Sequence, residues 1–219
     1  MVETNGRNFD LLTLGQVLLR LSPPDNERLS RGDTFVKQVG GAELNVAVGA
    51  ALLGLHTGVI SKLPAHDIGS FMKGKIRSFG VSDDFFMYDQ SPAARVGIYY
   101  YENGAYPRKP KVIYDRNHSS FFSLDIDEIP EEVYTASKCF HTTGITLALN
   151  EDIRETTIEM IKRFKAAGTL VSFDVNFRGN LWTGDQAREC ILRILPYVDI
   201  FFCSEDTARL TFLKTGTAR

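Results

Sequence analysis

Polar and charged side chains follow an apolar run late in the sequence. Asp174, Asn176 and Arg178 lie at or just beyond the end of a strand predicted over residues 170–175. In open α/β sheets this edge of the strands is where ligands bind, and a guanidinium suits bidentate contact with a carboxylate or phosphate. The pattern favours a site for a polar, anionic ligand. The alternative is a solvated loop in which Asp174 caps the next segment.

A pair of glycines stands between a strand predicted over residues 35–39 and a helix that begins near Ala42. Gly40 and Gly41 allow a ligand to approach the backbone closely, and free N–H groups point outward at a helix start. Asn45, about one turn later, offers a donor and an acceptor. A tight turn with an exposed Asn45 fits equally well. The stretch is not G-x-G-x-x-G, so a dinucleotide fingerprint is not supported.

Tyrosines are concentrated in a β-rich region over residues 85–122. Because side chains alternate along a strand, Tyr99 and Tyr101 share one face, and Tyr114 and Arg116 likewise share a face. An aromatic, hydroxyl-bearing sheet with an arginine can cover a small polar substrate. The alternative is an ordinary sheet whose tyrosines lie at a wet boundary.

Other motif-like patterns in the sequence do not indicate a functional site. Residues 69–75 match G-x-x-x-x-G-K, but Ile76 follows where a phosphate loop needs Ser or Thr, and the stretch lies inside an amphipathic helix predicted over residues 68–79. Ser204 and the two acids after it are typical of a helix N-cap. The three cysteines and four histidines show no ligand spacing, so no metal-ligating residue is assigned.

The elements that position these groups alternate between strand and helix. Repeated βα units with apolar strands imply a mostly parallel sheet that is covered on both faces. The region over residues 85–122 interrupts this alternation, because two β-rich runs flank a Gly/Pro-rich stretch and indicate antiparallel pairing. Apolar strands are predicted near residues 11–14, 59–61, 140–143, 170–175 and 198–203.

Composition limits the class of protein. The chain has 219 residues, of which 43% are apolar and 24% charged, as in a soluble globular protein of one or two domains. Its net charge of −2 gives no reason to expect nucleic acid or an anionic membrane as a partner. No apolar run reaches the ~20 residues of a membrane helix. The first residues contain no apolar signal core. These features predict a cytoplasmic chain.

Taken together, these pieces resemble the ribokinase-like (PfkB) carbohydrate kinases over essentially the whole chain. The resemblance rests on the first strand with Gly15, the glycine-rich stretch over residues 39–48, the β insertion and the strand that ends in Asp-Val-Asn-Phe-Arg. Within the family the chain is most similar to the 2-keto-3-deoxygluconate kinases. That narrower similarity is carried by residues 16–24 (QVLLRLSPP), 112–116 (VIYDR) and 174–182 (DVNFRGNLW).

The resemblance implies an α/β fold with a doubly wound, mostly parallel sheet and a small β-sheet lid. Residues 1–219 would form a partial ribokinase-like domain, with lid segments at about 16–39 and 85–122. The family's Gly-[Ala/Ser]-Gly-Asp motif, whose Asp is the general base, is not found in this sequence. The base and most of the nucleotide pocket are expected beyond Arg219, so no catalytic residue is assigned and the chain alone is expected to show negligible turnover.

The activity implied by the resemblance is transfer of the γ-phosphoryl group of ATP to the 6-hydroxyl of 2-keto-3-deoxygluconate, with Mg²⁺ bridging the phosphates. Ser204 falls where such kinases begin to contact the nucleotide. Substrate contacts are implied for Gly41, Asn45, Tyr99, Tyr114, Arg116 and Arg178.

Two alternatives stay open. A fructokinase or another sugar kinase of the same family would take a neutral sugar, which leaves the arginines without a carboxylate partner. A non-catalytic sugar-binding or dimerisation module is the second alternative. In each case a homo-oligomer is expected through the lid, because exposed β edges invite pairing.

Overall fold

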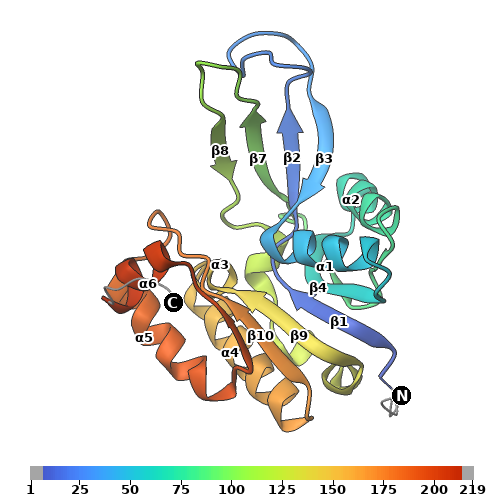
Figure 1. Cartoon of the computed structure of the whole chain (residues 1–219). Coiled ribbons are helices and arrows are strands. Elements are labelled where there is room, and N and C mark those ends of the chain that lie inside the picture. Colours follow the sequence, from blue (N-terminus) through green and yellow to red (C-terminus); the bar gives the residue numbers. More distant parts are fainter. Residues whose placement is uncertain (1–6, 214–219) are drawn as a thin grey trace.

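The computed structural model describes residues 7–213 and contains two sheets (Figure 1). The larger sheet has the strand order β11-β10-β9-β1-β4-β5, with β6 also paired to β4, and each of these pairs is parallel. This confirms the predicted mostly parallel α/β fold. The seven strands are β1 (Phe9–Leu14), β4 (Thr57–Pro64), β5 (Val81–Ser82), β6 (Phe86–Asp89), β9 (Ser137–Thr143), β10 (Leu170–Asp174) and β11 (Ile200–Phe202).

Helices connect these strands and cover the sheet. The α-helices are α1 (Ala42–Leu52), α2 (Asp67–Arg77), α3 (Gly144–Leu147), α4 (Glu151–Ala166), α5 (Gly184–Ile194) and α6 (Glu205–Phe212). Short 3₁₀ turns are η1 (Ser120–Ser123), η2 (Ile126–Glu128), η3 (Glu131–Thr135) and η4 (Leu195–Tyr197). No helix within residues 7–213 is both long and apolar enough to span a membrane.

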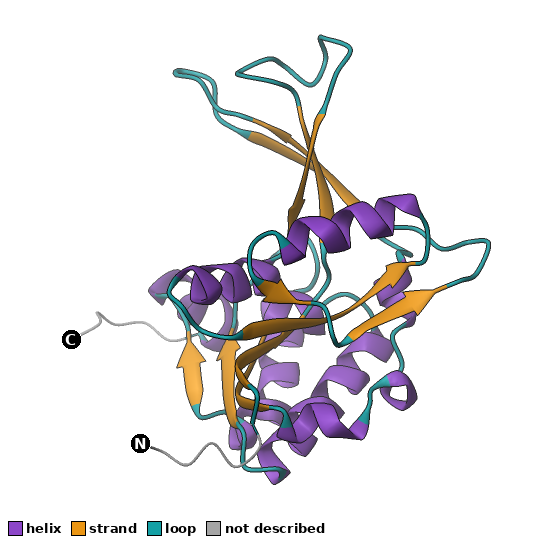
Figure 2. Ribbon diagram, turned by 90° about the vertical axis from the view of Figure 1, so that its right-hand side faces the viewer, coloured by secondary structure: helices purple, strands orange, loops and turns teal. Residues whose placement is uncertain are grey.

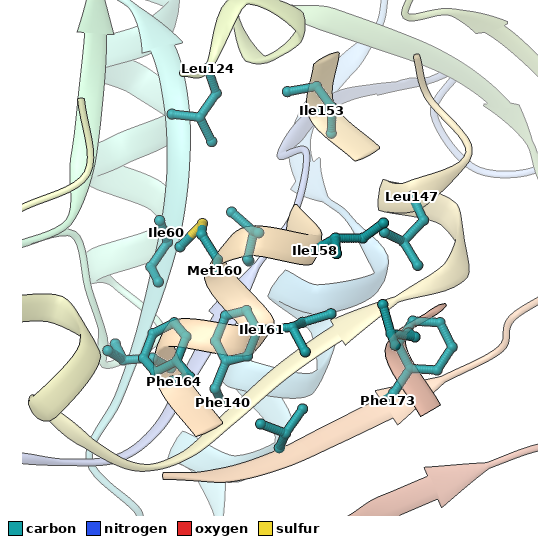
Figure 3. Close-up of a cluster of buried hydrophobic side chains, with 14 of the residues drawn as sticks. Ile60, Leu124, Phe140, Leu147, Ile153, Ile158, Met160, Ile161, Phe164 and Phe173 are labelled. Atoms are coloured by element: carbon teal, nitrogen blue, oxygen red, sulfur yellow. The ribbon is translucent and has the colours of Figure 1, made fainter. Parts of the chain in front are cut away.

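Helix α4 forms the centre of the main core. It starts at the predicted cap, where the Asn150 side chain accepts a hydrogen bond from the Ile153 backbone N–H at 2.8 Å. The rings of Phe164 on α4 and Phe140 on β9 stack with centroids 4.1 Å apart, and both side chains are fully buried (Figure 3). His141 follows Phe140 and therefore points to the opposite face of the sheet, where it lines a cavity together with Val46 of α1. The two faces of the parallel sheet are thus covered by different helices.

The glycines of the phosphate-loop-like stretch serve packing rather than a loop. Residues 69–75 lie inside α2, as predicted from the amphipathic pattern. A Cβ on Gly69 would lie 2.0 Å from the backbone oxygen of Pro64, at the end of β4. Gly69 therefore allows α2 to pack closely against the chain that leaves the sheet. Gly74, by contrast, has no neighbour within 4 Å of an added Cβ.

The second sheet projects from the body of the molecule as a four-stranded lid (Figures 1 and 2). Its order is β3-β2-β7-β8, and β7 and β8 pair antiparallel, as the two β-rich runs indicated. Tyr99 faces Tyr114 across this pair, and Arg20 faces Tyr99 across the next. The strands are β2 (Leu18–Ser22), β3 (Val36–Gly40), β7 (Gly97–Glu102) and β8 (Lys111–Asp115).

This sheet is shorter than the segments expected for the lid. Phe86–Asp89 pairs with β4 as part of the parallel sheet. Phe121, near the other end of the expected segment, is 1% exposed and packs in the main core. Phe86 and Phe121 therefore belong to the body, because these apolar side chains find burial there and not on the projecting sheet.

Candidate functional site

The lid and the edge of the parallel sheet line a cavity of about 390 Å³. Its residues come from the start of α1, the inner face of the lid and the loop after β10. They converge because the carboxyl ends of parallel strands open at one edge of the sheet. All six residues for which the resemblance implied substrate contacts line this cavity: Gly41, Asn45, Tyr99, Tyr114, Arg116 and Arg178.

A second cavity of about 280 Å³ shares residues with the first. Tyr114, Arg116 and Arg178 line both, and Asn117 and Asn180 are added in the second. The two guanidinium groups therefore lie where the cavities adjoin. Such a position lets them contact one bound molecule from the lid side and from the sheet side.

Gly41 forms the start of the α1 wall of the cavity. Its φ is 150°, and a Cβ at this position would lie 2.7 Å from the backbone oxygen of Gln16. No side chain caps the helix at Gly41, so backbone N–H groups at this helix start can meet a ligand. Asn45, one turn later, is exposed to the same cavity.

The lid presents two phenol groups to the cavity. The rings of Tyr99 and Tyr114 are tilted, with centroids 6.0 Å apart. Burial raises the pKa of Tyr99 above its ordinary value, so its hydroxyl is a neutral donor and acceptor. A Cβ on Gly40 would lie 2.5 Å from the Tyr99 hydroxyl oxygen. Gly40 therefore makes room for this phenol, while Gly41 shapes the helix start.

The two arginines are held in different ways. Arg116 is partly buried, and its Nε donates a hydrogen bond to Gln16 Oε1 at 2.7 Å. Burial lowers the pKa of Arg116, and the neighbouring Glu43 opposes that shift. Arg178 is exposed, and its side chain makes no hydrogen bond or ion pair with any residue that the structure describes. It is therefore available to a ligand.

Glu43 is a site residue that sequence reasoning missed. It lines the cavity, is 2% exposed, and accepts hydrogen bonds from Thr143 Oγ1 at 2.7 Å and Thr146 Oγ1 at 2.8 Å. A Cβ on Gly15 would lie 2.2 Å from Glu43 Oε2, so this glycine makes room for the carboxyl. Burial raises the pKa of Glu43 despite these hydrogen bonds. The one signal in the sequence was an acid near the start of a largely apolar helix.

Replacing Glu43 by glutamine is expected to remove a pH dependence of stability. Because the folded-state pKa lies above the unfolded value of about 4.5, the group contributes its stability below that pH and loses it as pH rises through the folded pKa. The variant should therefore become more stable relative to the wild type as the pH rises from 5 to 8. Urea titrations at each pH measure this as the difference between the two free energies of unfolding. Glu189→Gln, at an exposed helical position, is the control. A difference in the free energy of unfolding that is constant with pH would contradict a raised pKa of Glu43.

Ser204 lies apart from this cavity. It is the exposed N-cap of α6, and its Oγ accepts a hydrogen bond from the Thr207 backbone N–H at 3.2 Å. This is the plain N-cap interpretation of the sequence; the nucleotide role of Ser204 stays a prediction. The general base was expected beyond Arg219, and no described residue tests that prediction. Within residues 7–213, no group of three His, Cys, Asp or Glu side chains is placed to hold a metal ion.

Fold and sequence together define the class. The structure has a parallel α/β body, a four-stranded lid and a polar cavity between them. Residues 8–218 match the family model described as "pfkB family carbohydrate kinase". The chain belongs to the pfkB family of carbohydrate kinases.

Individual kinases of known name are similar to this chain in sequence or in structure. The 2-dehydro-3-deoxygalactonokinase of Haloferax volcanii is 36% identical over 209 residues, which cover 95% of this chain and 65% of that protein. The crystal structure of 2-dehydro-3-deoxygluconokinase from Thermotoga maritima matches with a TM-score of 0.89 and 33% identity, over 94% of this chain and 63% of that chain. An uncharacterized sugar kinase from Pyrococcus horikoshii in complex with ATP matches with a TM-score of 0.78 and 25% identity, over 93% and 66%. The chain thus spans about two thirds of the length of these relatives.

Proposed function

We propose that the complete protein phosphorylates 2-keto-3-deoxygluconate at its 6-hydroxyl, with ATP as the phosphoryl donor. The observation that carries this proposal is the meeting of Arg116 and Arg178 in one cavity with Tyr99, Tyr114 and the start of α1. A sugar acid has one fixed negative charge and several hydroxyls. Guanidinium groups match the charge, and phenol, amide and backbone groups match the hydroxyls.

The balance of charge in the cavity favours an acid over a neutral sugar. Arg178 has no partner among the described residues, and burial raises the pKa of Glu43, which weakens the counter-charge that this acid offers Arg116. A neutral sugar offers these two guanidinium groups no carboxylate, whereas a sugar acid can pair with them and gain binding energy. The names of the Haloferax and Thermotoga relatives point to the same substrate class.

The role of residues 7–213 in the reaction is to bind and enclose the sugar. The lid covers the cavity and can exclude water from the acceptor hydroxyl, which protects ATP from hydrolysis. Bound ATP would supply the phosphoryl group, and Mg²⁺ would spread the developing charge on its phosphates. Ser204, at the same edge of the sheet, is the proposed nucleotide contact.

Binding of two sugars to the complete protein tests the substrate. We expect calorimetry to give a dissociation constant for 2-keto-3-deoxygluconate at least tenfold lower than that for fructose, because only the acid engages both guanidinium groups. Tighter binding of fructose would favour the fructokinase alternative. Binding of the acid without any ATP-dependent phosphorylation by the complete protein would favour a sugar-binding module.

We also propose that copies of the protein pair through their lids. Val36 and Ile113 are 48% and 44% exposed on the projecting sheet, and the outer strands β3 and β8 have free edges within the described residues. Exposed apolar side chains and free β edges favour association. A monomer in sedimentation velocity of the complete protein would contradict this pairing.

A further inference from the structure

Gln16 joins the body of the protein to the base of the lid. It lies between β1 and β2, is 3% exposed, and contacts a segment about 100 residues away in the sequence. Its Nε2 donates hydrogen bonds to the Arg116 backbone oxygen at 3.1 Å and to Ser119 Oγ at 2.6 Å. Its Oε1 accepts the hydrogen bond from Arg116 Nε at 2.7 Å. One buried amide therefore fixes both the backbone and the side chain of Arg116.

The space around this amide is closely filled. A Cβ on Gly97, at the start of β7, would lie 2.7 Å from Gln16 Nε2. Gly97 pairs with Leu18 where β2 and β7 begin, so the amide lies at the junction of the lid and the body. Its position leaves little freedom for another rotamer. Arg116 is therefore anchored to a rigid point.

The hydrogen bond to Nε determines which edge of the guanidinium remains open. Among the described residues, Arg116 makes no hydrogen bond through its two terminal nitrogens, and Arg116 lines both cavities. A guanidinium fixed through one nitrogen can present its other N–H groups in the fork geometry that matches a carboxylate. Holding the group in advance reduces the conformational entropy lost on binding.

We propose that Gln16 is a positioning residue that aims the Arg116 guanidinium at the carboxylate of an acidic sugar, and so contributes to the preference for acids over neutral sugars. The inference rests on the proposed function, because it assigns the charge of the ligand to Arg116. Gln16 acts through Arg116 and takes no part in phosphoryl transfer.

The test replaces Gln16 by leucine, which keeps the approximate volume and removes the three hydrogen bonds. We expect the dissociation constant of the complete protein for 2-keto-3-deoxygluconate to rise about tenfold, and that for fructose to change less than twofold. Ser61→Ala is the matched control, because Ser61 is also buried and its Oγ donates a hydrogen bond at 2.8 Å to the backbone oxygen of Gly15, the residue before Gln16. The control should lose stability without changing either dissociation constant.

The outcomes separate the inference from the proposed function. Equal weakening of both sugars in Gln16→Leu, or no weakening of either, would overturn the positioning role. A wild type that binds no sugar acid would reject the proposed function instead. A second measurement stands even if the variant does not fold: NMR of the wild type should show slower solvent exchange for Arg116 Nε–H than for the exposed Arg178 Nε–H. Equal, fast exchange would overturn the anchoring by Gln16.

Discussion

Replacing Arg178 by alanine in the complete protein is expected to lower kcat/KM for 2-keto-3-deoxygluconate about 100-fold. The exposed side chain lines both cavities and has no partner among the described residues, so its charge is free for the substrate. Loss of a charge-assisted, bidentate contact costs roughly 2 to 3 kcal/mol of transition-state stabilisation. For the same reason, the melting temperature should stay close to that of the wild type.

Lysine at position 178 separates charge from geometry. Arg178→Lys keeps the positive charge but loses the planar fork, and we expect kcat/KM to fall about tenfold, roughly 1.4 kcal/mol. Arg188→Ala is the control, because Arg188 forms an ion pair with Asp185 on α5 and does not line either cavity. Steady-state kinetics with the acid and with fructose complete the comparison. Unchanged kinetics in both Arg178 variants would remove this residue from the site.

Alanine at Gly41 is expected to damage the site through the backbone. The φ of 150° is strained for any residue with a Cβ, and that Cβ would lie 2.7 Å from the backbone oxygen of Gln16. Either α1 or the segment after β1 must move, at a cost of about 1 to 3 kcal/mol in the free energy of unfolding. The same movement displaces Asn45 on α1 or Gln16, the residue that anchors Arg116. We therefore expect sugar binding to weaken at least tenfold, measured by calorimetry beside chemical denaturation.

The matched control is a second glycine on the same helix. Gly49 lies inside α1, and an added Cβ would meet nothing within 4 Å. Gly49→Ala should leave sugar binding unchanged and raise the free energy of unfolding by up to about 1 kcal/mol, because alanine is the better helix former. If Gly41→Ala binds sugar and unfolds like the wild type, the close approach of the helix start to Gln16 is needed neither for binding nor for stability.

Local patterns in the sequence were sufficient for the elements and for the polar groups at their ends. The apolar strand before Asp174, the period of α4 after Asn150 and the alternation of the tyrosines all depend on neighbours a few residues apart. These are the distances over which hydrophobic period and capping act. The same patterns predicted antiparallel pairing in the insertion. Its limits were overestimated, since Phe86–Asp89 pairs with β4 instead.

Gln16 and Glu43 were missed because their roles depend on residues about 100 positions away. Gln16 meets Arg116, and Glu43 meets Thr143 and Thr146. A buried amide or acid is recognisable only when its partners are known, and no local pattern carries that information. An acid in the first turn of a helix would ordinarily be interpreted as a solvated group that complements the helix dipole.

The sequence by itself determined the βα alternation, the family and the kinds of chemical groups available, since each of these follows from residue types at short spacing. Only the tertiary structure decided that Gly41, Tyr114 and Arg178 line one cavity, and that a buried amide holds the arginine on the lid. The reason is physical: the distance between side chains on different strands depends on sheet order and register, and these are chosen by packing of the whole chain.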